Sequence, residues 1–112
     1  MGKNTGYAVK KGPNVNAANV SSATALVAAT TGTQLGLRTL IVSTSVAAGI
    51  TIQDDAATPV VLVPRIYMPA NATLTLYWDE EDTPLGTAGQ DIDIISTTAD
   101  VVSAKATAYL MG

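Results

Sequence analysis

Six of the nine acidic residues in this 112-residue chain lie in one stretch, YWDEEDTPLGTAGQDID, at residues 77–93. Carboxylates gathered in this way can hold a divalent cation, or act as a general acid and base on either side of a sugar. A calcium site takes about six to eight converging oxygens, and the spacing here does not match the EF-hand loop. On a strand, Asp91 and Asp93 would point to the same face, so a weak cation site remains an alternative.

The same stretch is a poor candidate for catalysis. A carboxyl group needs burial before its pKa rises toward neutrality, and the acids at 79–82, followed by Pro84 and Gly86, are typical of a solvated loop. Asp54 and Asp55, which follow the segment ITIQ, are interpreted in the same way, as an acidic pair in an exposed turn.

The residue types that most enzymes use are missing from the sequence. It has no His, which removes the usual general base and the commonest transition-metal ligand, and no Cys for thiolate chemistry. It also lacks the nucleophile elbow, the P-loop and the dinucleotide-binding motif. We therefore predict a protein that is not an enzyme, with no catalytic residue, no metal site and no cofactor.

The basic residues are few and gather at the start of the chain. Lys3, Lys10 and Lys11 lie within the first eleven residues, where there is no acid. Nucleic-acid binding needs a broader basic face than three lysines supply. No segment approaches the roughly 20 apolar residues that cross a membrane. Neither nucleic acid nor a membrane is expected as a partner, and no small-molecule ligand is expected.

The elements that must position these residues are β-strands. Hydrophobic residues make up 47% of the chain and charged residues 13%, and the apolar share comes mainly from Ala, Val, Leu and Ile, with no Phe. Small and β-branched residues suit thin β layers. About six or seven short alternating segments recur between Gly, Pro and Asp breakers. We predict an all-β fold, a small β-sandwich or jelly-roll-like domain.

Alternation within these segments predicts which side chains share a face of a strand. One such set is Leu40, Val42, Thr44 and Val46, the next is Ile50 and Ile52, and the third is Leu74, Leu76 and Trp78. In the last segment, the predicted inward residues are Val102, Ala104, Ala106, Ala108 and Leu110. The predicted outward set near the carboxyl end is Ser103, Lys105, Thr107 and Tyr109. Because Pro59 and Pro64 flank its apolar run, segment 57–69 is expected to be a bent or edge strand.

The first twenty residues form a zone of their own. MGKNTGYAVKKGPNVNAANV is rich in Gly, Asn and Lys, with one short possible strand at 7–11. We predict an extended N-terminal arm over residues 1–20 and a β-sandwich domain over residues 21–112. A helix over residues 15–30 is the alternative, because Ala is frequent there, although the Ser, Thr and Val content argues against it.

A monomer with so few charges would be poorly protected against association, so part of its apolar surface is expected to be buried against other subunits. The arm would gain order on a neighbouring copy, by adding a strand to a sheet edge or by laying its lysines on an acidic surface. The predicted protein-interface residues are Lys3, Tyr7, Lys10 and Lys11 on the arm, and Asp79, Glu80, Glu81 and Asp82 on the receiving loop.

The stretch SSATALVAATTGTQLGLRTLIVSTSVAAGITIQ, in a short chain without His or Cys, resembles small structural proteins of tailed bacteriophages, most of all capsid decoration (cement) proteins. The resemblance covers residues from about 21 to 112 and is one of composition, so no site residue carries over. It implies a homotrimer that binds the outer surface of the capsid, with the major capsid protein as partner, and stabilises the shell. Such a protein is made in the bacterial cytoplasm and located on the virion.

Two alternatives stay open. A tail, baseplate or head-fibre component would be built from the same kind of domain, and the number of copies per particle separates it from a decoration protein. A cation- or carbohydrate-binding β-sandwich module would use the loop 79–93, and calcium would then raise its thermal stability.

Overall fold

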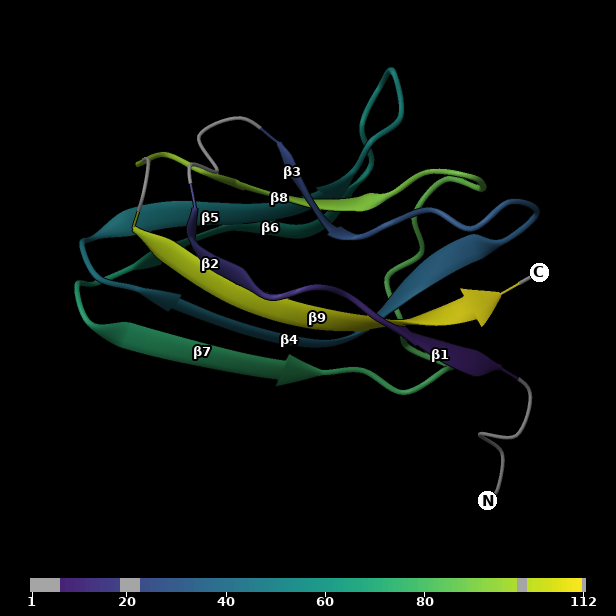
Figure 1. Ribbon diagram of the computed structural model, residues 1–112, viewed down its shortest axis with the longest axis horizontal. Helices are drawn as coiled ribbons and strands as arrows, with labels where there is room; N and C mark the ends of the chain where they lie inside the picture. The colour runs from purple at the N-terminus through teal and green to yellow at the C-terminus, as the bar shows by residue number, and fades with distance from the viewer. Residues whose placement is uncertain (1–6, 19–22, 99–100, 112) are drawn as a thin grey trace.

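A computed structural model describes residues 7–18, 23–98 and 101–111, and these ranges contain nine strands and no helix (Figure 1). The strands are β1 (Ala8–Lys11), β2 (Val15–Ala18), β3 (Thr24–Val27), β4 (Gln34–Thr44), β5 (Ala48–Asp54), β6 (Val61–Met68), β7 (Ala72–Tyr77), β8 (Ile92–Ser96) and β9 (Val102–Met111). In the same ranges, nothing resembles a membrane-spanning helix. The all-β prediction is confirmed, and the alternative helix over 15–30 is wrong where β2 and β3 form.

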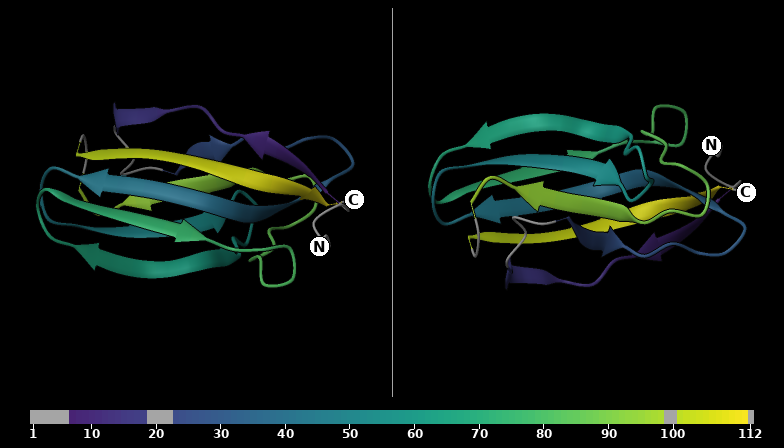
Figure 2. Two further views of the ribbon diagram at one scale, coloured as in Figure 1. Left: turned by 90° about the horizontal axis from the view of Figure 1, so that it is seen from below. Right: turned by 90° about the horizontal axis from the view of Figure 1, so that it is seen from above.

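The strands form two antiparallel sheets that pack face to face (Figures 1 and 2). In the first, which we name the β4 sheet, the order is β1-β9-β4-β7, and β2 also pairs with β9. In the second, the β5 sheet, the order is β3-β8-β5-β6. The links from β4 to β5 and from β6 to β7 cross from one sheet to the other, and the predicted β-sandwich is confirmed.

Alternating side chains fill the space between the sheets, as the sequence pattern predicted. Leu40 and Val42 are buried on the β4 sheet and Ile50 and Ile52 on the β5 sheet, whereas Ile41 is exposed. From β9, the core receives mainly alanine methyl groups, those of Ala104, Ala106 and Ala108. Val46 was predicted to continue the face of Leu40 and Val42, and it does not, because β4 ends at Thr44 and Val46 lies in the following turn, 50% exposed.

The described part of the arm belongs to the sandwich. β1 pairs with β9 from Ala8↔Leu110 to Lys11↔Thr107, and β2 pairs with the start of β9. Between them, the Gly12 N–H donates to the Ala106 carbonyl at 2.9 Å. A Cβ on Gly12 would overlap the backbone carbonyl of Leu26, so only glycine fits this close approach. The arm was expected to gain order on a neighbouring copy, and instead residues 8–18 add strands to their own sheet.

β6 is an edge strand of the β5 sheet, as its prolines predicted. Pro64 is exposed, and the pairing of β6 with β5 shifts register near Ile52. β7 forms the edge of the β4 sheet on the same side of the molecule (Figure 2, left). Leu74 and Leu76 point inward from β7 and Trp78 packs against the core just after it, as predicted, but all three are only half-buried.

Candidate functional site

The acidic run forms an exposed turn after β7. Asp79 Oδ1 accepts hydrogen bonds from the backbone N–H groups of Glu81 and Asp82, both at 3.2 Å. Asp79, Glu81 and Asp82 are exposed, as expected for a solvated loop, whereas Glu80 is half-buried. Glu80 Oε2 finds no hydrogen-bond partner among the described residues. The turn therefore presents three carboxylates to solvent and makes its own internal hydrogen bonds.

The start of this turn lies over Tyr109. The Tyr109 hydroxyl donates to the Trp78 carbonyl at 2.8 Å, and the residue is 3% exposed. Burial, and next the neighbouring Tyr77 hydroxyl, raise the pKa of Tyr109 above its ordinary value. Tyr109 was predicted to face outward like Lys105, and it is not exposed because the chain after β7 covers it.

Asp54 is not the exposed turn residue that the sequence predicted. It ends β5 and is 1% exposed. Its Oδ1 accepts from the backbone N–H groups of Ala56 at 3.2 Å and Val60 at 2.9 Å. Its Oδ2 accepts from the N–H of Thr87 at 2.7 Å and from the Thr87 hydroxyl at 2.5 Å. One buried carboxylate thus fastens both the loop after β5 and the loop before β8.

These hydrogen bonds determine the charge state of Asp54. Burial by itself would raise the pKa of Asp54, but the hydrogen bonds from Thr87, Val60 and Ala56 hold it below its ordinary value. The carboxylate is therefore ionised at neutral pH. The alternating pattern could have indicated that Asp54 is buried, because Asp54 lies on the same face of the strand as Ile50 and Ile52.

Asp91 and Asp93, the pair considered for a cation, have different environments. Asp91 Oδ1 accepts from the backbone N–H of Ala29 at 2.6 Å. Asp93 lies within β8 and is 4% exposed. Burial, and then the negative charges of Asp55 and Asp91, raise the pKa of Asp93 to about 6. Across the described residues there is no group of three or more acidic side chains arranged to hold a metal ion.

The predicted interface residues of the arm are partly engaged within the chain. The Lys10 ammonium donates to the Ala28 carbonyl and to the Thr30 hydroxyl, both at 2.9 Å. Tyr7 and Lys11 are exposed, and Lys3 lies outside the described residues. Lys10 therefore ties β1 to the segment after β3, and is not left free to meet the acidic turn.

The acidic residues of the described ranges are gathered at one end of the sandwich. β5 and β7 end, and β8 begins, at the end that we name the acidic end. It holds eight of the nine acidic residues; the ninth, Asp100, lies outside the described ranges. The acidic end comprises Asp54, Asp55, Asp79, Glu80, Glu81, Asp82, Asp91 and Asp93.

The opposite end, which we name the neutral end, is formed by the turns at 45–47, 69–71 and 97–98. The described residues of these turns carry no charge. Two depressions open here, of about 460 and 320 Å³. The larger is lined by Ala47, Ala48, Gly49, Tyr67, Met68, Pro69 and Thr97. Sequence reasoning missed this end, because its turns come from three separate parts of the chain.

Tyr67 is the most exposed large apolar side chain of the described residues, at 74%. The Arg65 guanidinium lies 5.9 Å from the centroid of its ring, and Arg65 Nη1 donates to the Tyr67 hydroxyl at 3.3 Å. A cation over an aromatic face restrains both side chains. The neutral end therefore carries a projecting aromatic ring beside an uncharged depression.

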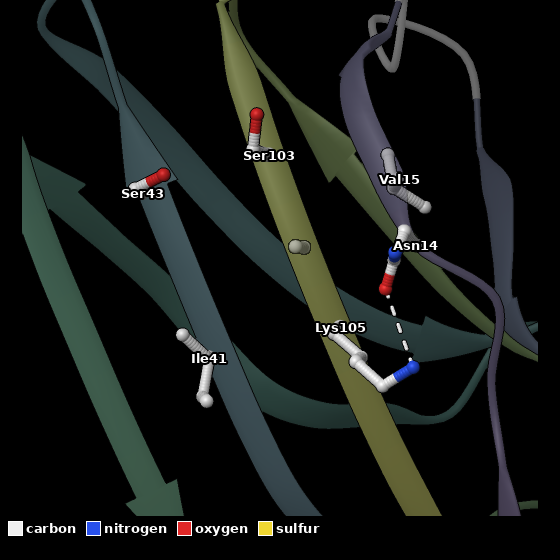
Figure 3. A pocket seen from close by; sticks show the side chains of 7 residues that line it. Asn14, Val15, Ile41, Ser43, Ser103 and Lys105 are labelled. Carbon is white, nitrogen blue, oxygen red and sulfur yellow. Dashed lines mark hydrogen bonds between the residues drawn. The ribbon is translucent and has the colours of Figure 1, made fainter.

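A third depression, of about 340 Å³, lies on the outer face of the β4 sheet (Figure 3). Lys105 reaches toward the arm and donates to the Gly12 carbonyl at 3.3 Å and to Asn14 Oδ1 at 3.2 Å, while Ile41 and Ser43 line the other side. The sequence predicted Lys105 to face outward. Since β1 and β2 cover one edge of β9, its amine helps to hold the arm.

Comparisons with protein-family models, with curated proteins and with solved structures found no match to this chain.

Proposed function

We propose that this chain is a non-enzymatic virion protein, which binds the outer surface of a tailed-phage capsid and stabilises the shell as a decoration protein. The observation that supports a binding role is the separation of acidic residues along the described part of the sandwich, with eight acids at one end and turns at the other whose described residues, 45–47, 69–71 and 97–98, are uncharged. The centres of protein interfaces are depleted in charged residues. The neutral end is therefore the surface that meets the shell, and the acidic end faces solvent.

Tyr67 supplies the anchor of this contact. Tyrosine and arginine are enriched among the residues that dominate binding energy, and Tyr67 stands exposed with Arg65 against its ring. The depression beside it is lined by small and apolar side chains that leave little to desolvate. The partner in this proposal is the major capsid protein. Each contact is modest, roughly 800 Å² per partner, and many copies add their contributions.

The experiment that tests the proposal is the copy number of the chain in purified particles, measured by quantitative mass spectrometry against the major capsid protein. A count in simple ratio to the shell subunit is the expected result. A low count per particle would place the chain in the tail, baseplate or head fibre. Complete absence from particles would overturn the virion proposal.

The contact surface is tested by Tyr67→Ala in rebinding to particles that lack the protein. We expect the affinity to fall at least roughly tenfold, because the residue is the projecting anchor. The matched control is Leu85→Ala, which removes an exposed apolar side chain at the acidic end and should leave binding unchanged. Equal binding by wild type and Tyr67→Ala would show that the neutral end is not the contact.

A further inference from the structure

The two sides of the sandwich are closed to different degrees. On the side of the arm, Val15, Leu26 and Val27 are buried and complete the core. On the side of β6 and β7, the inward row that starts on β7 stays half-buried along its whole length. This row consists of Ala72, Leu74, Leu76 and Trp78. The core is thus left partly open along β7.

β7 also lacks the features that protect the other edge strands of the described ranges. Among these, β6 carries Pro64, Arg65 and register shifts, β1 carries Lys10 and Lys11, and β3 has four residues and a register shift. β7, ATLTLY, contains no charge and no proline. Its register with β4 is unbroken over six residue pairs. Such an edge is a template for pairing with another strand.

One hydrogen bond at the end of β7 shows which of its residues direct their backbone N–H and C=O groups to β4 and which direct them to the free edge. The Trp78 N–H donates to the Arg38 carbonyl at 2.8 Å, which makes residues 38 and 78 a hydrogen-bonded pair in the antiparallel ladder. Because this property alternates along a strand, the even-numbered residues of β7 direct their backbone groups to β4. Thr73, Thr75 and Tyr77 direct theirs to the free edge.

We propose that β7 pairs antiparallel with β7 of a second copy of this chain, about a two-fold axis at Thr75, so that the two β4 sheets become one continuous sheet. In this register Leu74 lies opposite Leu76 of the second copy, and Leu76 opposite its Leu74, so the half-buried rows cover each other. The antiparallel arrangement puts the two acidic turns at opposite ends of the interface, so like charges do not meet. The assembly has two copies, in place of the three that the resemblance implies.

Sedimentation equilibrium of the free protein tests this pairing. The wild type should be a dimer, and Thr75→Pro and Thr75→Lys should be folded monomers. Proline at 75 removes an N–H that β4 does not use, and lysine is a natural protector of sheet edges. The matched control, Val9→Lys, places the same charge on the opposite edge strand of the same sheet and should remain dimeric.

Disulfide trapping tests the register, because the chain has no cysteine of its own. Opposed residues of a hydrogen-bonded pair have their Cα atoms about 5.5 Å apart, within the range of a disulfide. Thr75→Cys should therefore form a covalent dimer on oxidation. Thr73→Cys should not, because the two residues 73 would be separated by four residue steps, about 13 Å.

A wild type that is a monomer or a trimer would overturn the pairing. Dimers that persist in both Thr75→Pro and Thr75→Lys would also overturn it. So would covalent trapping through position 73 but not 75. These measurements use the free protein and the shell-binding proposal is tested on particles, so either proposal can fail without the other.

Discussion

Two buried aspartates near the acidic end show how position decides the charge of one residue type. Burial raises the pKa of either carboxyl, yet Asp54 has a lowered pKa because Thr87, Val60 and Ala56 donate hydrogen bonds to it. Asp93 has a raised pKa, about 6, because burial is reinforced by the negative charges of Asp55 and Asp91. The fold therefore favours the anion of the first aspartate and disfavours the anion of the second.

Asp54→Ala should destabilise the protein by about 3 kcal/mol at pH 7, because it removes a buried carboxylate that accepts hydrogen bonds from three backbone N–H groups and one hydroxyl in two loops. The contribution of the wild-type carboxylate is present at neutral pH. It is lost as the pH falls below about 4 and through the lowered folded-state pKa. Urea unfolding measures the free energy. The control is Asp79→Ala, an exposed aspartate that also accepts two backbone N–H groups, with an expected cost under about 1 kcal/mol.

Asp93→Asn should make the protein more stable at pH 7, by up to about 3 kcal/mol. Between about pH 4 and 6, the folded wild type keeps a proton on Asp93 that the unfolded chain has released, so its stability falls as the pH rises through this window. Asparagine does not titrate, so the unfolding free energy of Asp93→Asn should not fall between about pH 4 and 6 in this way. Parallel pH profiles for wild type and variant would contradict the assignment.

At the scale of the elements, the attachment of the arm to the sandwich depends on the close approach of Gly12 to the backbone of Leu26. Gly12 lies against the Leu26 carbonyl, where a side chain has no room, and Lys10 and Lys105 add hydrogen bonds on either side. These contacts join β1 and β2 to β9 and to the segment after β3. They make the described part of the arm an integral edge of the β4 sheet.

Gly12→Ala should detach this edge, because the new methyl group overlaps backbone and not a movable side chain. Trypsin should then cut after Lys10 and Lys11 roughly tenfold faster than in the wild type, since cleavage requires local opening. Pro13→Ala is the control, because Pro13 is the exposed neighbour of Gly12. Equal rates for Gly12→Ala and wild type would show that the arm is not held by this approach.

The sequence predicted the strands better than their partners. Alternation placed Leu40, Val42 and Ile52 in the core because the rule depends only on neighbours along the chain. It could not show that residues 8–18 pair with β9, since that pairing joins residues nearly a hundred positions apart. For the same reason, the sequence could not show that backbone N–H groups of Ala56, Val60 and Thr87 donate hydrogen bonds to Asp54. The acidic pair after β5 was therefore interpreted as a solvated turn.

At the scale of the whole molecule, the charge separation distinguishes two ways of binding a shell. A contact at the neutral end should depend weakly on salt, because the described turns at that end carry no charge and Arg65 is the charged residue beside the anchor Tyr67. We expect particle affinity to change less than about threefold between 50 and 500 mM NaCl. A steep loss of affinity with salt would instead place the contact at Asp79–Asp82, where the sequence first suggested an interface.

β9 pairs with β4 on one side and with β1 and β2 on the other, and it follows all of them in the chain. During synthesis, the β4 sheet therefore lacks the strand that joins β1 and β2 to β4 until residues 102–111 have left the ribosome. The arm, although made first, has no strand to pair with until then. Folding of this sheet is thus completed after translation of β9, and each nascent chain passes through a stage in which the edge of β4 is open.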